Sequence, residues 1–311
     1  MSGSGTVIDP LRRALELLGD RWTLLILQSV FLRVRRYDDI RARLDISPGA
    51  LSGRLRELVD SRVLERVPYR TAHRTRHEYH LTSRGLALWQ LLVAIWRWEA
   101  EWVPGRADEL PSLIHLDCGA TCSPELACRT CGRSARVRDV RATRSPGLTV
   151  SSATGSRRFS RSSSSAPRDP LLFFPVSMEL LGDRWMTGIL VCALLGEQHF
   201  SEFQRELGIG PSVLSSRLRR LVQLDVVRET TAATRSDATA YRLTPKGRAF
   251  FPALAVIVEW ARADYPTGRR PAVILDHGDD RHPFTPALHC SNCGRLLHRE
   301  RVRVDAHPEA K

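Results

Sequence analysis

The heptamer ELLGDRW occurs twice in this chain of 311 residues, at 16–22 and again at 179–185. Three more matches follow in the same order and at nearly the same offset. They are LSGRLRELV (51–59) with LSSRLRRLV (214–222), YHLTSRG (79–85) with YRLTPKG (241–247), and CRTCG (128–132) with CSNCG (290–294). Because order and spacing both persist, the chain contains two copies of one domain, and its length fits two domains of ordinary size.

Each copy shows the same succession of helix and strand signals. In the first copy the apolar spacing predicts helices over 11–18, 20–32 and 37–44, and Asp20 is placed to cap the second of them. Ser47 and Pro48 then open a fourth helix. Its apolar face would be formed by Leu51, Leu55 and Leu58, and a two-stranded hairpin and a long helix from Thr82 to Trp102 follow. This order is typical of a winged helix-turn-helix, whose second turn helix enters the DNA major groove.

These motifs together resemble those of a known family. ELLGDRW, ISPGALSGRLRELV, EYHLTSRG and the trailing segment with CxxCG are similar to the HxlR family of bacterial transcriptional regulators. The resemblance covers nearly all of both copies and implies a DNA-binding regulator, more often a repressor than an activator. Members of that family are typically homodimers, so two copies in one chain are a departure from the pattern.

The fourth helix supplies the first set of predicted DNA contacts. Since its leucines must face the core, the remaining side chains face the groove or its edge, and small residues near its start permit close approach of the DNA backbone. Arg54 is expected to make a bidentate contact to guanine. The predicted contacts are Ser47, Gly49, Ala50, Ser52, Gly53, Arg54 and Arg56 in the first copy, and Ser212, Val213, Ser215, Ser216, Arg217 and Arg219 in the second.

The hairpin tips supply the second set, and they differ in charge. The first tip carries a basic cluster suited to phosphate contact. Its predicted contacts are Arg70, His73, Arg74, Arg76 and His77. The second tip offers only Arg235, beside Asp237. The first copy should therefore carry more of the electrostatic affinity.

The last helix of each copy is apolar on most faces. LALWQLLVAIWRWEAEW holds four of the seven Trp residues, and FFPALAVIVEWARADY is similarly apolar. Such helices need burial that a small winged domain cannot provide alone, which predicts pairing between the copies. The chain would then act as an intramolecular pseudo-dimer, and a homodimer of whole chains is the competing arrangement. A pocket for a small-molecule effector among the Trp side chains is the alternative to plain packing.

Cysteine spacing predicts metal sites after each winged domain. Four thiols in a C-x3-C-x5-C-x2-C pattern suit a tetrahedral structural zinc site, with His115 as an alternative to Cys122. In the second copy, alignment of DHG (276–278) with DCG (117–119) places His277 among the ligands, and His282, His289 and His298 are candidates for the fourth. The predicted sets are Cys118, Cys122, Cys128 and Cys131, and His277, His282, Cys290 and Cys293. Free reduced thiols are the other interpretation, because a cytosolic chain disfavours disulfides.

The expected fold is therefore mainly α with small β-hairpin wings. It has two tandem winged helix-turn-helix domains, each followed by a short Cys/His segment that resembles a zinc ribbon. The winged domains are expected over 8–104 and 170–266, and the Cys/His segments over 112–140 and 272–305. A flexible basic linker rich in Ser and Arg is expected over 141–169. Residues 132–169 hold nine Arg and two Asp, over half of the net charge of +13, so the overall charge is weak evidence for a nucleic-acid partner.

The remaining patterns narrow the class of protein. No apolar run is long enough to span a bilayer and no secretory signal is recognisable, so we expect a cytoplasmic, nucleoid-associated protein with no membrane partner. Phosphate-binding loops, GxSxG and HExxH are missing, and no H-x-E precedes the CxxC, so we expect no enzyme. The alternative function is a zinc-containing module that binds protein or RNA, with a partly degenerate second winged domain.

Overall fold

The computed structural model describes residues 9–70, 75–145, 174–232, 235–264, 270–278 and 282–305. We call the described residues up to 145 repeat one and those from 174 onward repeat two. The chain divides into two compact units. The repeat-one unit comprises Leu17–Ala127, Ser156–Asp183 and Ala287–Lys311, and the repeat-two unit comprises Met1–Glu16, Cys128–Gly155 and Arg184–Pro286, as far as these are described. Each unit is named after its winged domain, and each contains segments of both repeats.

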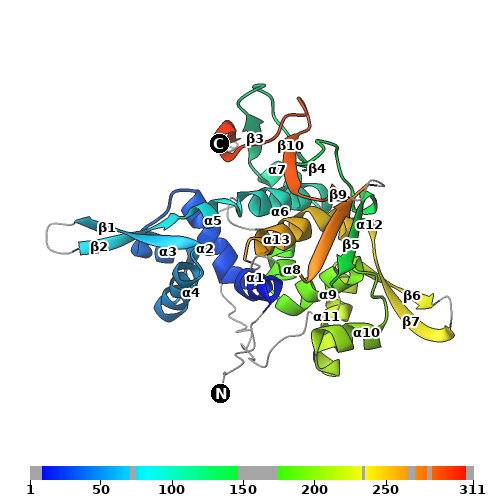
Figure 1. Ribbon diagram of the computed structural model, residues 1–311. Coiled ribbons are helices and arrows are strands. Elements are labelled where there is room, and N and C mark those ends of the chain that lie inside the picture. The colour runs from blue at the N-terminus through cyan, green and yellow to red at the C-terminus, as the bar shows by residue number, and fades with distance from the viewer. Residues whose placement is uncertain are drawn as a thin grey trace, which may run out of the picture. The chain divides into compact units, whose positions relative to one another are not determined.

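The winged domain of the repeat-one unit has the predicted element order. Its elements are α2 (Arg21–Phe31), α3 (Tyr37–Leu44), α4 (Pro48–Asp60), β1 (Leu64–Arg70), β2 (Thr75–Leu81), α5 (Ser83–Leu86) and α6 (Trp89–Trp102). β1 and β2 pair antiparallel, from Leu64 opposite Leu81 to Arg70 opposite Thr75, and form a ribbon that projects beyond α3 and α4 (Figure 1). This arrangement confirms the expected wing and the helices α2, α3 and α4. The single long helix expected from Thr82 to Trp102 is instead divided into α5 and α6 by a turn at Ala87 and Leu88.

Local signals account for where these helices begin. Asp20 accepts a hydrogen bond from the Thr23 amide at the start of α2, and Ser47 caps α4, whose first residue is Pro48. The leucine face of α4 is buried as predicted: Leu51, Leu55 and Leu58 are at most 1% exposed. Full burial of a leucine side chain contributes about 1.5–3 kcal/mol to stability, so this face fixes the rotation of α4 about its axis.

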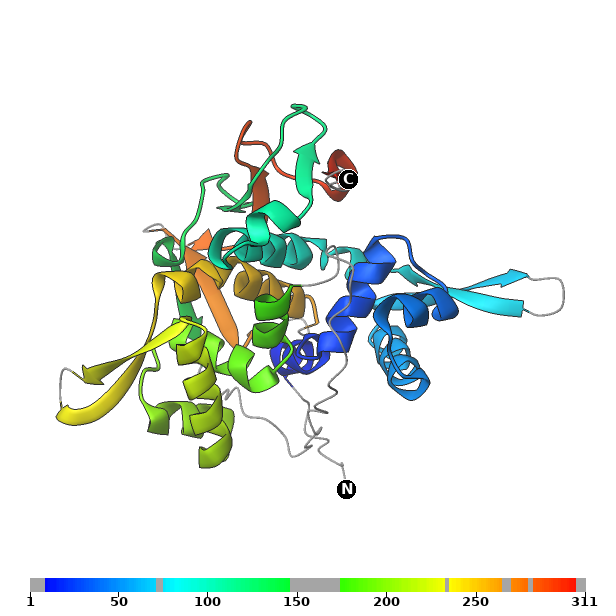
Figure 2. The same cartoon turned by 180° about the vertical axis from the view of Figure 1, so that it is seen from behind.

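The winged domain of the repeat-two unit repeats this plan. Its elements are α9 (Arg184–Leu194), α10 (Phe200–Leu207), α11 (Pro211–Gln223), β6 (Val227–Ala232), β7 (Arg235–Leu243), α12 (Pro245–Ala249) and α13 (Phe251–Arg262). β6 and β7 form its wing, which can be followed from behind in Figure 2. The equivalent leucines of α11, Leu214, Leu218 and Leu221, are also at most 1% exposed.

The repeated LTxxG motif locks the wing to the following helix. The Thr82 hydroxyl donates to the carbonyl of Arg62 and accepts from the Gly85 amide. A Cβ on Gly85 would collide with the Val63 carbonyl oxygen, so only glycine fits there. Thr244 and Gly247 make the same arrangement in repeat two. The recurrence of the motif in both repeats therefore has a direct packing cause.

The first helix of each repeat belongs to the unit named after the other repeat. α8 (Pro175–Leu181), the first helix of repeat two, packs on α2 and α6 in the repeat-one unit. α1 (Pro10–Leu18) lies in the repeat-two unit as far as Glu16. The two heptamers contact each other at Asp20 and Asp183, which form an antiparallel backbone bridge. The two copies of ELLGDRW thus mark the points at which the chain passes from one unit to the other.

The small sheets also combine strands of both repeats. In the repeat-one unit β3 (Ser112–His115) pairs antiparallel with β11 (Val302–Asp305). In the repeat-two unit β8 (Val273–His277) lies between β5 (Val140–Arg144) and β9 (His282–Pro283). β4 (Pro124–Cys128) pairs with β10 (Pro286–Cys290), and the short helices α7 (Arg106–Glu109), η1 (Val137–Asp139) and η2 (Arg299–Arg301) complete the elements.

Two expected boundaries differ from this arrangement. The Cys/His segments 112–140 and 272–305 do not form separate small modules, because their outer strands pair with strands of the other repeat. The linker expected from residue 141 begins later, since β5 continues to Arg144 and is held by pairing with β8. The rest of that expected linker, residues 146–169, lies outside the described residues.

Candidate functional site

The outer face of α4 carries small and basic side chains. Ser47, Gly49, Ser52 and Arg56 are exposed, and Ala50 and Gly53 are half-buried. A Cβ built on Gly49 or on Gly53 would meet no heavy atom within 4 Å, so open space lies beside the backbone there. Tyr37 on α3 also contacts this part of α4. Its hydroxyl donates to the Pro48 carbonyl at 3.0 Å and lies 3.1 Å from the Ser52 hydroxyl. A nucleic-acid duplex could therefore approach this helix closely.

Arg54 has a protein partner, which differs from its expected role at guanine. Its Nε and Nη2 donate to the two carboxylate oxygens of Asp20 at 2.8 and 2.7 Å, and its side chain is 23% exposed. The hydrogen bond to Asp20 also raises the Arg54 pKa. Residue 54 follows Leu51 by one helical turn, which places it at the edge of the buried face beside α2. One carboxylate thus caps α2 and anchors α4, and the Arg54 guanidinium is engaged within the protein.

The outer face of α11 follows the same plan in repeat two. Ser212, Val213, Ser216 and Arg219 are exposed, and Ser215 and Arg217 are half-buried. Arg217 stands where Arg54 stands in repeat one, and it too has a partner. Val213 is 37% exposed and is one of the larger apolar side chains on this surface. The two helix faces share their plan but differ in detail, because Val213 stands where the first has Ala50, and Ser212 and Ser216 stand where it has Gly49 and Gly53.

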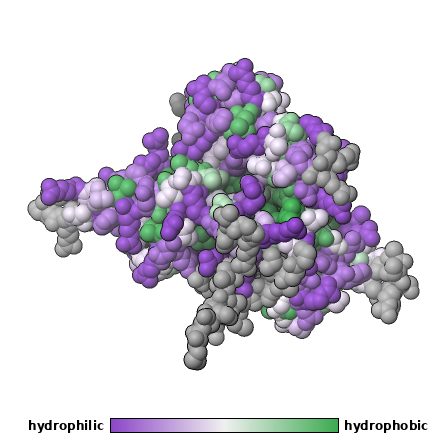
Figure 3. Space-filling model, viewed as in Figure 1, coloured by the Kyte–Doolittle hydropathy of each residue, from purple (hydrophilic) through white to green (hydrophobic). Residues whose placement is uncertain are grey.

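The wing of repeat one presents exposed basic side chains along both strands. Arg70, Arg76 and His77 are exposed, and the described part of the wing is mainly hydrophilic on the side seen in Figure 3. Arg76 pairs with Asp38 at 3.0 Å, but both side chains are more than half exposed, so this pair contributes little to stability. His73, Arg74 and the side chain of Arg235 lie outside the described residues.

One basic residue near the wing was missed by the sequence analysis. Arg36, just ahead of α3, is exposed, lies 4.8 Å from the centre of the Tyr69 ring and donates to Glu78 at 3.0 Å. The bond to Glu78 raises the Arg36 pKa, and it lowers the Glu78 pKa. Arg36 is also bridged to Glu78 through its backbone. No motif marks it, because its position beside the wing depends on the packing of α3 against β2.

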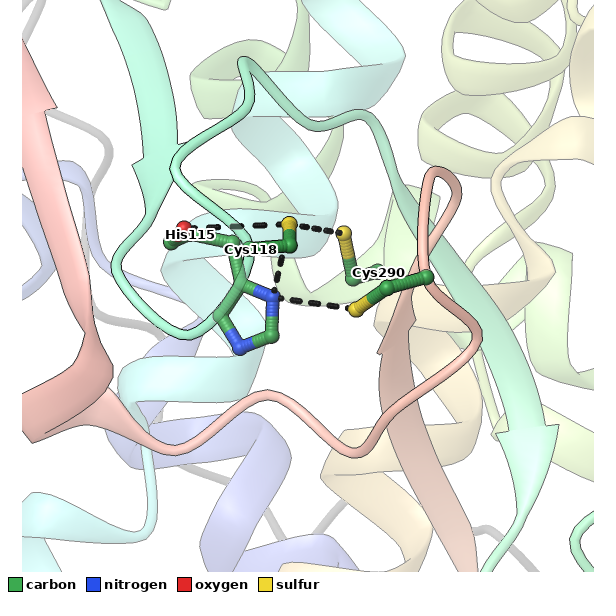
Figure 4. A group of neighbouring side chains, drawn as sticks. His115, Cys118 and Cys290 are labelled. Carbon is green, nitrogen blue, oxygen red and sulfur yellow. Dashed lines mark hydrogen bonds between the residues drawn. The ribbon is translucent and has the colours of Figure 1, made fainter.

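Eight Cys and His side chains among the described residues gather into two groups of four that could hold a metal ion. The first group, in the repeat-one unit, is His115, Cys118, Cys290 and Cys293. His115 Nδ1 lies 3.5 Å from Cys118 Sγ and 3.3 Å from Cys293 Sγ, and the Sγ atoms of Cys118 and Cys290 are 3.9 Å apart. Figure 4 shows His115 and Cys118 on one segment turned toward Cys290 on another.

The second group has the same layout in the repeat-two unit. It consists of Cys128, Cys131, His277 and His282. Cys128 Sγ lies 3.3 Å from His282 Nε2, and Cys131 Sγ lies 3.3 Å from His277 Nδ1. Burial lowers the pKa of His277, which favours the neutral imidazole that a metal requires.

The ligand sets expected from the sequence are therefore regrouped. Each set of four was assigned within one repeat, whereas each group in the structure takes two residues from each repeat. The offset of 162 residues between the CxxCG motifs makes His115 the equivalent of His277, and the register agrees, with His115 opposite Val302 and His277 opposite Val140. The alignment of DCG with DHG was off by three residues, and the alternative ligand His115 replaces Cys122 in the first group.

Cys122 joins neither group. It is 2% exposed and packs with Val93, Leu113 and Leu288 in a core cluster. Burial raises the pKa of its thiol to about 12, whereas the hydrogen bond from Ala120 helps to lower that of Cys118 to about 6. Cys122 is thus suited to packing and Cys118 to thiolate chemistry. His289 and His298, the other candidates for the fourth ligand, also lie outside both groups.

Three of the four Trp side chains of α6 are used for packing. Trp98 is 2% exposed, and Trp89 and Trp96 pack against the core cluster that contains Cys122. The indole of Trp96 donates to the Pro111 carbonyl at 3.1 Å. These contacts account for the three side chains without a ligand, so the effector pocket remains only a prediction.

The fold and these surfaces are those of a tandem winged helix-turn-helix protein. A family model described as HxlR-like helix-turn-helix matches residues 17–107 and 180–268, more than half of the chain. The chain therefore belongs to the HxlR-like helix-turn-helix family, as the sequence motifs indicated.

Relatives of the chain match one repeat's length. The HTH-type transcriptional regulator Rv3095 of Mycobacterium tuberculosis is 40% identical over 136 residues, which is 44% of this chain and 85% of the relative. YvaP, an HTH-type transcriptional regulator of Bacillus subtilis, is 35% identical over 89 residues, 28% of this chain and 82% of the relative. The solved structure of PA1607, a proposed transcription factor, is 34% identical, covers 42% of this chain and 93% of its own, and has a TM-score of 0.38. The two matched regulators each align with under half of this chain and with most of their own length, which is what a duplication produces.

None of the described helices combines the length and apolar character needed to cross a membrane.

Proposed function

We propose that this chain is a sequence-specific, double-stranded DNA-binding transcriptional regulator, and that it acts as a repressor. α4 and α11 are the recognition helices in the major groove, and the wings contact flanking backbone or the minor groove. The observation that carries the proposal is the outer face of α4, where small side chains and open space at Gly49 and Gly53 lie beside exposed Ser52 and Arg56. The regulators among its relatives support it.

The contacts proposed for repeat one are fewer than the sequence suggested, because Arg54 is engaged with Asp20. Arg56 takes over as the basic residue of α4, and Arg219 is its counterpart on α11. Exposed serines on both helices can donate to phosphates and base edges. Specificity would then come from many modest contacts and from DNA shape rather than from one bidentate arginine.

We further propose that the two repeats act as an intramolecular pseudo-dimer on an imperfect inverted repeat, with half-sites about 10 base pairs apart or a multiple of that spacing. The exchange of α8 and of the tail strands between repeats supports this, because each compact unit already contains chain from both. A structural zinc ion in each Cys/His group completes the proposal. The protein acts in the cytoplasm at the nucleoid and has no catalytic role.

A gel-shift titration with the DNA upstream of the protein's own gene tests the proposal. We expect a sequence-selective complex of one chain per site whose affinity falls steeply with salt. Equal affinity for RNA or single-stranded DNA would contradict it. That result would favour the second candidate, a module that binds protein or RNA, for which the exposed Val213 at the start of α11 is the supporting observation.

The wings allow a finer test, because their charge differs. Replacing Arg70 and Arg76 by Ala should weaken binding and reduce the slope of log K against log salt by about 0.9 for each phosphate that these arginines neutralise. The matched control is Arg235→Ala in the second wing, which we expect to change both quantities less. An equal effect from the control would show that the two wings contribute equally to the electrostatic part of the DNA affinity.

A further inference from the structure

The two Cys/His groups have the composition of tetrahedral zinc sites. In such a site, ligand atoms lie about 3.6 Å apart for a nitrogen and a sulfur and about 3.8 Å apart for two sulfurs. The measured separations of 3.3, 3.5 and 3.9 Å in the first group match these values. All ligand atoms of each group lie within 4.8 Å of one another, and all seven cysteines are free of disulfides. Sulfur-rich sets of this kind select zinc over oxygen-seeking cations such as magnesium.

The surroundings of the first group are those of a prepared ligand set. His115 is fully buried and aims Nδ1 at the sulfurs, while its Nε2 lies 3.3 Å from Asp117 Oδ2. Asp117 is itself held by Arg301. A histidine that binds metal with one nitrogen commonly contacts a carboxylate with the other, which fixes the ring orientation. The Asn292 amide also points to Cys118 Sγ, at 3.7 Å.

The sequence positions of the ligands are the unexpected feature. Each CxxC motif lies with a His-containing hairpin of the other repeat, and neither lies with its own. The β3–β11 and β5–β8 pairings each join a strand of repeat one to a strand of repeat two, and they have the same register in both units. We propose that each zinc ion takes two ligands from each repeat, one site being Cys3His and the other Cys2His2, so that the two ions clasp the repeats to each other. This rests on the zinc binding included in the proposed function.

A second observation independently favours the crossed arrangement. Glu99 on α6 is fully buried, and its Oε1 accepts hydrogen bonds from the amide and the hydroxyl of Ser177 on α8, a helix of repeat two. At the equivalent positions the repeat-two unit has Ala261 on α13 and Ala14 on α1, both buried. If each first helix packed on its own repeat, Glu99 would face Ala14 and lose the hydroxyl donor. A buried carboxyl group that loses a hydrogen-bond donor is destabilised, which favours the crossed packing.

Paired substitutions in the full-length chain test the clasp by zinc content, measured after dialysis against a weak chelator. The wild-type chain should hold two zinc ions. Cys118→Ser with Cys293→Ser removes ligands of one crossed site, so one ion should remain. Cys118→Ser with Cys131→Ser removes ligands of both crossed sites, so none should remain. Ligation within each repeat predicts the reverse order for these two variants, and that result would overturn the proposal.

Two further variants, together with the wild-type zinc content, keep the outcomes distinct. Cys122→Ser should retain both ions, because this thiol belongs to the core. A wild-type chain that holds no zinc would refute zinc binding itself, whereas two ions with the reversed loss pattern would refute only the crossing. If the double variants do not fold, cobalt-substituted Cys131→Ser decides: the crossed arrangement leaves a site with three thiolates, and ligation within repeats leaves a site with two. The thiolate charge-transfer absorbance of the cobalt then differs in the ratio of three to two.

Discussion

At the scale of single residues, two arginines on α4 have different roles. Arg54 is held by Asp20, which also caps α2, so it links α2 and α4 within the winged domain. Arg56 is two residues further along α4 and is exposed. A difference of two positions, about 200° of helical rotation, moves a side chain from the helix interface to the surface. The same residue type therefore serves stability at one position and is available for recognition at the other.

This division predicts opposite phenotypes. Arg54→Ala should lower the free energy of unfolding by about 1–2 kcal/mol, since it removes two charged hydrogen bonds from a half-buried carboxylate. Arg56→Ala should leave stability within about 0.5 kcal/mol and weaken DNA binding. Denaturant unfolding and binding titrations on both variants measure this. Unchanged stability of Arg54→Ala together with abolished binding would return Arg54 to the DNA surface.

Glycines offer a second test at this scale. Gly53→Ala adds a methyl group to open space in mid-helix, so we expect the free energy of unfolding to rise by up to about 1 kcal/mol. DNA affinity should fall nonetheless, because the methyl group occupies space that the DNA backbone would use. Gly85→Ala is the control, and it should destabilise because its Cβ meets the Val63 carbonyl. If Gly53→Ala bound DNA as well as the wild type, close approach at this point would be disproved.

At the scale of elements, the contact of α8 with α6 has an unusual polar centre. Ser177 supplies both hydrogen bonds to Glu99 Oε1, whereas Oε2 is buried and has no hydrogen-bond partner among the described residues. Burial is the largest influence on this carboxyl and raises the Glu99 pKa, although the bonds from Ser177 act in the opposite direction. The helix pair therefore gains specificity from a group that is costly to keep charged.

The raised pKa predicts a pH dependence of stability. The folded chain retains the Glu99 proton at a pH where the unfolded chain has released it, so stability should fall as pH rises through the window between the ordinary carboxyl pKa and the raised one. Glu99→Gln should remove this component, whereas Glu101→Gln, at an exposed position of the same helix, should keep it. Denaturant unfolding at a series of pH values provides the measurement. A wild-type curve with no such fall would show that the carboxyl titrates normally.

At the scale of the whole molecule, neither unit consists of one repeat. The repeat-one unit needs α8, β10 and β11 from repeat two, and the repeat-two unit needs most of α1 and β5 from repeat one. Separation of the repeats would therefore expose buried helix faces in both units. This distinguishes the chain from two independent domains joined by a tether, since neither repeat carries a complete core.

Cutting the chain between the repeats tests this interdependence. A protease site inserted between residues 145 and 174 should yield two fragments on a denaturing gel that remain a single species with the full mass by light scattering. The uncut chain with the same insertion is the control. Fragments that separate under native conditions, each with normal secondary structure, would show that each repeat folds by itself.

The sequence by itself determined the winged domains, because their signals are local. The caps at Asp20 and Ser47, the leucine face of α4 and the LTxxG turn all act within a few residues, and the structure contains each of them. Only the tertiary structure decided which distant partners meet. Arg54 bonds to Asp20, which is 34 residues distant in the sequence, and Cys118 lies beside Cys290, at a separation of 172 residues. The physical reason is that each repeat contains both halves of a ligand set and both helices of a pair. Either half could therefore combine with a partner from its own repeat or from the other one. Strand pairing and the burial of whole helices choose between two homologous partners, and that choice leaves no local trace in the spacing of residues.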